Sequence, residues 1–324
     1  MLSQLRSTPT ILLPVYGRSA LLAEAWHSLQ DQSDPDWQLL IADDGSDGAT
    51  AAWIAAGPAK DQRTTWIRRS QNLGLFANLN AALETLDEIS WVLLLCSDDR
   101  LLPDAVATIK KLRNQWPEAP WILSTHLSIG SQGEPLANTS AVDHCQFAAT
   151  TCTFKSDEFI PLLLRYGSIN GNLTGMAFSV QFWREAGVFR SDWRHAADWE
   201  WLIRASEKAP VLLNREPIVQ VRTHPAQLSN ANQTSGDELL EVAAVQRLLL
   251  AHPLLKNEPR RYKWASHRLQ FQLWNLFKQA AKGNWHSVLT GLQHIHITVG
   301  LLPAFIALLT WLPQRFRSFY SELR

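Results

Sequence analysis

Two pairs of adjacent aspartates, Asp43-Asp44 and Asp98-Asp99, are the residues of this chain best placed to do chemistry. Each pair directly follows an apolar, strand-like run. Carboxylates at the carboxyl ends of adjacent buried strands converge on the crevice where open α/β sheets bind ligands. Burying adjacent acids there is costly unless hydrogen bonds or a cation compensate their charges. Four acids at one sheet edge therefore predict a cation site.

The first pair is continued by Gly45 and Ser46, and two interpretations fit this segment. A carboxylate fixed at a strand end can accept hydrogen bonds from the ring N–H of a nucleobase and from a ribose hydroxyl. Alternatively, the segment is a solvated turn whose Asp and Ser side chains cap backbone groups.

The second pair suits a divalent ion that bridges a diphosphate. Mg²⁺ is usually bound by one or two carboxylates while substrate phosphates complete its octahedron. The alternative is a helix N-cap, because Leu101, Leu102 and Pro103 after the pair resemble the approach to a helix.

The elements that would position these acids alternate through the first half of the chain. Apolar, strand-like runs lie at 10–15, 37–42, 64–68, 91–95 and 121–125. Helical patterns lie between them at 19–30, 75–86 and 104–116. This alternation predicts an α/β fold with a doubly wound, mostly parallel sheet and helices on both faces.

The second half is less regular up to residue 230 and helical beyond residue 236. Residues 127–153 are polar and are interpreted as loops with edge strands. Helical patterns at 156–166 and 198–208 and strand-like runs at 211–213 and 218–221 follow. After a polar breaker the pattern is helical to the end, which predicts a catalytic domain over residues 1–235 and a C-terminal helical region over 236–324.

Composition excludes several classes of function. With 30 Lys and Arg against 30 Asp and Glu, the zero net charge argues against a nucleic-acid partner. Three cysteines, an odd number, argue against a secreted disulfide framework and favour a reducing cytoplasm. The polar N-terminal segment lacks the apolar core of a signal peptide, so export is not expected. Neither a P-loop nor a Rossmann glycine signature occurs.

The segment 297–312 is almost entirely apolar, but Gly300 and Pro303 interrupt it and it is shorter than the roughly 20 residues of a spanning helix. Together with Arg315 and Arg317 it suits contact with a membrane surface. A packed helical subdomain or a homo-oligomer interface is the alternative.

The order of these motifs resembles the family 2 glycosyltransferases, which are inverting, nucleotide-sugar-dependent enzymes of GT-A fold. The similar segments are the opening strand 10–16, Asp43-Asp44-Gly45-Ser46, Asn72-Leu73-Gly74, Ser97-Asp98-Asp99, the helix start 196–204 and Arg222-Thr223-His224. The resemblance covers residues 8–230 and implies a GT-A fold there.

This resemblance also implies roles for particular residues. A nucleotide-sugar donor would be bound by Asp43, Asp44, Ser46, Asn72 and Asp98. The nucleotide implied is most often a uridine diphosphate.

The resemblance further implies that Mg²⁺ or Mn²⁺ is held by Asp99, Asp98 and His224, and that Arg222 compensates phosphate charge. Asp198 matches the general base, a carboxylate that takes the proton of the attacking hydroxyl group. Structural alternatives remain for two of these residues: Asp198 as an acid at a helix N-terminus, and His224 as a hydrogen-bonding group.

The predicted function is an inverting glycosyltransferase that moves one sugar from a UDP-sugar to a hydroxyl of a surface polysaccharide or a lipid-linked glycan. The location predicted is the cytoplasm, or the inner face of the plasma membrane. One alternative is a non-catalytic scaffold of GT-A fold, because Cys96 and Ala197 replace acids of the family motifs. Another is a nucleotidyltransferase, although residues 16–19 do not form its Gly-rich basic loop.

Overall fold

The computed structural model describes residues 8–17, 19–136, 147–169, 173–228, 232 and 236–322. The chain forms two compact units. Unit 1 comprises Met1–Ser156, Asn170–Asp192 and Arg204–Pro225, and unit 2 comprises Asp157–Ile169, Trp193–Ile203 and Ala226–Arg324. The functional division at residue 235 stays a prediction, and unit 2 also includes residues 157–169, 193–203 and 226–235.

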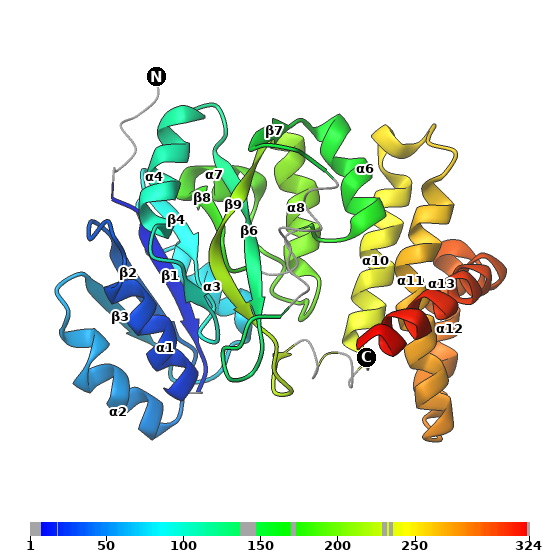
Figure 1. The fold of residues 1–324 in the computed structure, drawn as a ribbon, viewed down its shortest axis with the longest axis horizontal. Helices are drawn as coiled ribbons and strands as arrows, with labels where there is room; N and C mark the ends of the chain where they lie inside the picture. The colour runs from blue at the N-terminus through cyan, green and yellow to red at the C-terminus, as the bar shows by residue number, and fades with distance from the viewer. Residues whose placement is uncertain are drawn as a thin grey trace. The chain divides into compact units, whose positions relative to one another are not determined.

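Unit 1 contains a single mixed sheet with the strand order β3-β2-β1-β4-β8-β6-β9-β5, and β7 pairs with β9 (Figure 1). The strands are β1 (Thr10–Val15), β2 (Gln38–Asp43), β3 (Thr64–Arg68), β4 (Trp91–Leu94), β5 (Arg100–Leu101), β6 (Trp121–Ile129), β7 (Cys152–Phe154), β8 (Met176–Ser179) and β9 (Val211–Arg222). Strands β1 to β4 are parallel to one another, whereas β8 runs antiparallel between β4 and β6. Because β1 lies between β2 and β4, the winding direction reverses beside it, which is where such sheets bind ligands.

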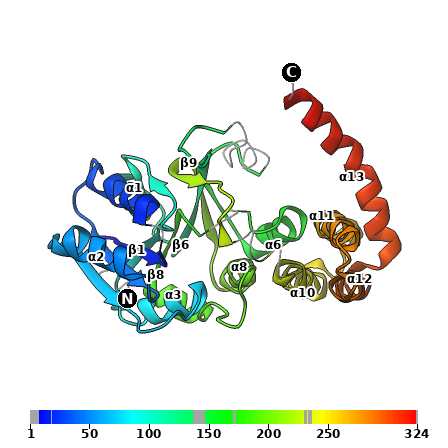
Figure 2. The same cartoon turned by 90° about the horizontal axis from the view of Figure 1, so that it is seen from below.

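Helices cover both faces of this sheet, as predicted. The core on one face joins the strands to α1 (Ser19–Gln30), α2 (Gly48–Ala56) and α4 (Ala105–Gln115). On the other face lie α3 (Leu75–Leu83), as Figure 2 shows, and α7 (Val180–Ala186), and η1 (Pro58–Lys60) follows α2. Because both faces are covered, β1 and β2 are buried at every residue after the first rather than at alternate residues.

Two parts of the sheet differ from the sequence-based prediction. The runs at 211–213 and 218–221 form one strand, β9, whose pairing with β6 shifts register between Ser124 and His126. Pro217 has no backbone N–H to donate to a neighbouring strand. The register shift lies at this position, so the strand continues past the proline. Strand β8 and helix α7 were not anticipated, and part of the predicted loop region 127–153 lies outside the described residues.

Unit 2 is helical in the described residues. It holds most of α6 (Ser156–Tyr166), the first half of α8 (Ala197–Lys208), α10 (Asp237–Ala251), η2 (Pro253–Leu255), α11 (Arg261–Ala281), α12 (Trp285–Val299) and α13 (Leu301–Glu322). Gly300, with φ +83°, ends α12, and the chain bends by 99° into α13. Among the helices described, none is long and apolar enough to cross a bilayer by itself; α12 and the start of α13 meet that test only as a bent pair.

Candidate active site

The first acid of the Asp43-Asp44 pair is the last residue of β2 and is fully buried. Its Oδ1 accepts the backbone N–H of Ser46 at 2.8 Å, which closes the turn after the strand. Its Oδ2 accepts from the indole N–H of Trp66 at 3.3 Å and lies 3.5 Å from Nε of Arg68. The turn is therefore fixed, and one carboxylate oxygen of Asp43 is directed at groups on β3.

The second acid of this pair, Asp44, joins the turn to the loop before α3. Its two oxygens accept the backbone N–H groups of Leu73 and Gly74 at 2.8 and 2.9 Å. Gly45 adopts φ +75°, and a Cβ there would lie 3.0 Å from the backbone of Gln71. Only glycine suits that close approach between turn and loop.

The same loop presents Asn72 to solvent, while Ser46 is buried and its hydroxyl accepts the N–H of Gly17 at 3.0 Å. Four of the five residues predicted to bind the donor therefore lie at the carboxyl end of β2 and in the loop attached to it. The fifth, Asp98, follows β4, two strands away.

Asp98 and His224 form a polar pair. Nε2 of His224 lies 3.0 Å from Oδ2 of Asp98, and their side chains are 8% and 16% exposed. Asp98 follows β4 and His224 follows β9, so the sheet brings together two residues 126 positions apart in sequence. Two of the three predicted metal ligands, Asp98 and His224, thus meet in unit 1, and both keep some access to solvent.

Asp99 is buried and turned into the protein. Its Oδ1 accepts the backbone N–H of Arg222 at 2.8 Å, and its Oδ2 accepts the hydroxyl of Thr174, which in turn accepts the N–H of Cys96 at 2.9 Å. Burial and then the charge of Asp98 raise the pKa of Asp99, against these two hydrogen bonds. Asp99 thereby ties the loop after β4 to β9 and to Thr174, two residues before β8.

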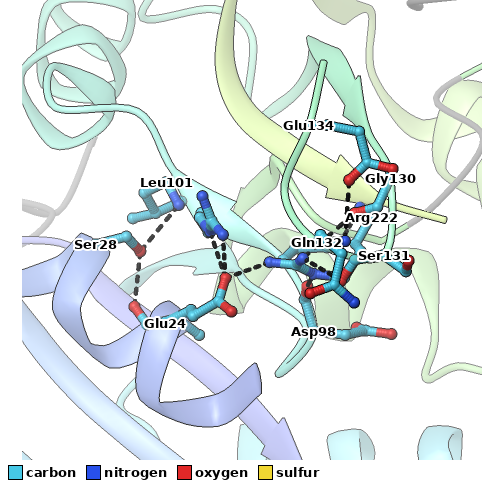
Figure 3. Close-up of polar contacts among 12 residues, drawn as sticks. Glu24, Ser28, Asp98, Leu101, Gly130, Ser131, Gln132, Glu134 and Arg222 are labelled. Carbon is cyan, nitrogen blue, oxygen red and sulfur yellow. Dashed lines mark hydrogen bonds and ion pairs between the residues drawn. The ribbon is translucent and has the colours of Figure 1, made fainter. Parts of the chain in front are cut away.

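Arg222 supports the same loop from inside the protein, as Figure 3 shows. Its side chain is fully buried, with Nε donating to the carbonyl of Asp98 at 2.9 Å and Nη1 donating to the carbonyls of Gly130 and Ser131. Its Nη2 forms an ion pair with Glu24 on α1. The role that the resemblance implied for Arg222, compensation of phosphate charge, does not fit a guanidinium occupied by these groups.

Glu24 holds two arginines at once, because Arg100 on β5 also pairs with it. Burial by itself would raise the pKa of Glu24, but hydrogen bonds from Arg100 and the charges of Arg222 and Arg100 outweigh it and hold the pKa below its usual value. A charged Glu24 therefore compensates the buried guanidinium that positions Asp98. The sequence motifs did not predict the contacts of Glu24 with Arg222 or of Thr174 with Asp99.

Asp198, the predicted base, lies in unit 2 near the start of α8. Glu241 on α10 accepts the N–H groups of Arg194, His195 and Ala196 at 2.7, 2.7 and 2.8 Å and so fixes the segment that leads into α8. Burial, together with the charge of Glu241, raises the pKa of Asp198 to about 6. A carboxylate of that pKa can accept a proton near neutral pH.

In the described part of the chain, no three or more His, Cys, Asp and Glu residues gather as a metal cage. Asp98 and His224 still fit a divalent ion, because a carboxylate oxygen and an imidazole nitrogen are both ligands that Mn²⁺ accepts. An ion that also binds substrate phosphates needs few protein ligands. Asp99, with both oxygens accepting hydrogen bonds, is less suited to that role than the other two.

Solved structures of similar fold are glycosyltransferases. TarS 1–349 of Staphylococcus aureus, in complex with UDP-GlcNAc, has a TM-score of 0.63 at 14% identity over 90% of this chain and 81% of that one. The mannosyltransferase PcManGT of Pyrobaculum calidifontis, in complex with GDP-Man and Mn²⁺, has a TM-score of 0.52 at 15% identity over 93% and 86%. The fold is therefore that of the GT-A glycosyltransferases, as predicted.

The sequence places the chain more narrowly. Residues 10–116 match Glycosyl transferase family 2, which confirms the recognition made from the motifs. TuaG of Bacillus subtilis strain 168, whose name assigns it to teichuronic acid biosynthesis as a glycosyltransferase, is 30% identical over 95 residues, 29% of this chain and 37% of TuaG. The matches span 20%, 72% and 37% of the lengths of three curated relatives. The family match and the solved structures of similar fold together support glycosyltransferase activity.

Proposed function

We propose that this protein transfers one sugar from a nucleoside diphosphate sugar, a UDP-sugar, to a hydroxyl group of a glycan or lipid-linked glycan, with inversion at the anomeric carbon. The observation that carries the proposal is the Asp98–His224 pair after the carboxyl end of β4, next to the switch in winding direction of the sheet. The fixed turn at Asp43 and Asp44 lies at the end of β2 in the same unit.

The donor in this proposal is bound in two parts. The turn and loop that carry Asp43, Asp44, Ser46 and Asn72 take the nucleoside, and Asp98 lies toward the diphosphate. The TarS structures in complex with UDP and UDP-GlcNAc support a uridine nucleotide. PcManGT is in complex with GDP-Man, so the fold alone does not determine which nucleobase the donor carries.

Asp98 and His224 would hold Mg²⁺ or Mn²⁺. When bound there, the ion would offset the negative charge of the diphosphate leaving group. Arg222 binds the backbone carbonyl of Asp98, and Thr174 and the backbone N–H of Arg222 hold the adjacent Asp99. These contacts fix the position of Asp98.

Asp198 would act as the base. As the acceptor oxygen bonds to the anomeric carbon, its proton passes to the carboxylate of Asp198, and the bond from that carbon to the diphosphate oxygen breaks. The nucleoside diphosphate leaves with the bonding electrons. The transferred sugar then has the anomeric configuration opposite to that of the donor. The raised pKa of Asp198, about 6, suits a proton acceptor at neutral pH.

The test is thermal stabilisation by UDP-GlcNAc, UDP-glucose and GDP-mannose, each with and without Mn²⁺. A ligand at a hundred times its Kd stabilises the native state by about 2.7 kcal/mol, which is a readily measured rise in Tm. We expect a UDP-sugar to raise Tm only with Mn²⁺, and Asp98→Ala to abolish that rise. Asp31→Asn, an exposed acid on the loop after α1, is the matched control and keeps it. If no nucleotide sugar raises Tm with or without the ion, the proposal is wrong.

A further inference from the structure

Helix α13 presents an exposed apolar stripe. Its members share one side of the first three turns and are between 43% and 70% exposed: Leu301, Leu302, Phe305, Ile306 and Leu309. The opposite side of the same turns, at Ala304, Ala307 and Leu308, is buried in unit 2. The helix is thus apolar on both sides, and packing inside unit 2 uses only one. Contiguous large apolar side chains of this kind mark an interaction surface rather than ordinary surface scatter.

The end of α11, the start of α12 and the turn between them add aromatic and basic groups to the same unit. Phe277, Trp285 and Leu289 are exposed, and so are Lys278 and Lys282 between and beside them. Indole and ammonium groups next to apolar side chains are typical of the boundary between lipid headgroups and acyl chains.

Charge is distributed very unevenly along the chain. Residues 259–324 contain nine Lys and Arg and a single acid, Glu322, whereas residues 1–258 contain 21 Lys and Arg and 29 acids. The segment that carries the apolar stripe is therefore strongly basic, although the whole chain is neutral. Basic segments next to an apolar surface are attracted to leaflets rich in anionic lipid.

We propose that α13 docks on the surface of an anionic lipid bilayer, with the stripe in the headgroup region and the basic segment against the lipid phosphates. A helix with one apolar side lies in the plane of the interface with that side buried by about 5–10 Å. A second copy of the chain is a poorer occupant, because symmetric pairing of this face would bring two strongly basic segments together. The docked unit would hold the protein where lipid-linked acceptors are found.

The test is flotation of the full-length protein with vesicles of phosphatidylcholine alone or with one third phosphatidylglycerol. We expect binding to the anionic vesicles, at least tenfold weaker binding to the neutral ones, and release by high salt. Leu302→Ser combined with Phe305→Ser should lower binding at least tenfold, while Leu248→Ser combined with Val188→Ser, matched exposed positions on α10 and after α7, should leave it unchanged.

A charge variant keeps the test decisive if the stripe variant does not fold. Lys278→Gln combined with Lys282→Gln should lower binding to anionic vesicles at least fivefold without changing the melting temperature. Equal binding to both vesicle types, or none, would overturn the proposal. So would retention in the membrane after an alkaline carbonate wash, since a surface-docked helix is released, or a solution dimer that Leu302→Ser combined with Phe305→Ser converts to monomer.

Discussion

At the scale of single residues, the candidate site depends on buried groups that support Asp98 through hydrogen bonds. Asp99 is held by the N–H of Arg222 and the hydroxyl of Thr174, and Arg222 is held by Glu24. These residues position Asp98 through the backbone on either side of it. These residues share one buried hydrogen-bond network, so a single substitution leaves more than one partner without a hydrogen bond. Such substitutions should therefore lower the free energy of unfolding.

Thr174→Val tests this support. The change keeps the shape of the side chain but removes the hydroxyl that donates to Asp99 and accepts from Cys96. Leaving such buried groups without that partner costs about 1–3 kcal/mol. We expect the free energy of unfolding, measured by urea denaturation, to fall by about 2 kcal/mol for Thr174→Val and by much less for Thr174→Ser, which keeps the hydroxyl. Equal stability of the two variants would show that the hydroxyl is not part of this support.

At the scale of elements, Glu241 connects α10 to the segment that leads into α8 and contributes to the pKa of the predicted base, Asp198. Glu241 on α10 binds three N–H groups ahead of α8, and its charge contributes to the raised pKa of Asp198. Glu241→Gln removes that charge but keeps an acceptor oxygen. Because burial is the larger cause of the raised pKa, the change should lower the pKa of Asp198 by less than about one unit.

The measurement is release of nucleoside diphosphate from the donor as a function of pH. A base of pKa about 6 is active when deprotonated, so the rate should rise with pH through about 6 and then level off. Glu241→Gln should move this rise to lower pH, and Glu185→Gln, an exposed acid on α7, should leave it in place. A rate that does not rise with pH through about 6 in the unmodified protein would remove Asp198 from the role of base.

The elements also show what the sequence could predict. The bounds of β1, α1 and β3 agree with the strand-like and helical patterns, and the acid pairs lie at strand ends as expected. Strand β8 was missed because it enters the sheet between β4 and β6 by antiparallel pairing, which is a tertiary event with no local signature. Its run of apolar residues is too short to tell a strand from the helix that follows.

The supporting contacts of the site were unpredictable for a related reason. Thr174 reaches Asp99 across 75 positions, and Glu24 reaches Arg222 across 198. A glutamate on a helix and a threonine in a loop are both common on protein surfaces, so residue type alone does not reveal these contacts. Family motifs locate groups that contact ligands, whereas the groups that hold them become visible only in the folded sheet.

At the scale of the whole molecule, buried acids set how stability depends on pH. Glu238 on α10 is buried, with Gln272 of α11 donating to it at 3.3 Å, and burial raises its pKa to about 7. A raised pKa means that the folded protein prefers the protonated acid. The stabilisation from this group is therefore complete below pH 4.5 and is lost as pH rises through 7. Asp61 acts oppositely: hydrogen bonds from Arg63 outweigh burial and lower its pKa to about 2, so its contribution is lost only in strong acid.

Glu238→Gln separates this effect from every other titrating group, because the amide keeps the shape of the side chain and cannot ionise. Between pH 4.5 and 7 the free energy of unfolding of the wild type should fall by roughly 3 kcal/mol more than that of the variant, as expected for a shift of about 2.5 pKa units. Urea denaturation followed by tryptophan fluorescence at pH 5, 6, 7 and 8 measures the difference. The two proteins should be similar at pH 5, and the variant should be the more stable at pH 8. If their stabilities stay parallel from pH 5 to 8, Glu238 is ionised at little cost in the folded protein and the helices around it admit water.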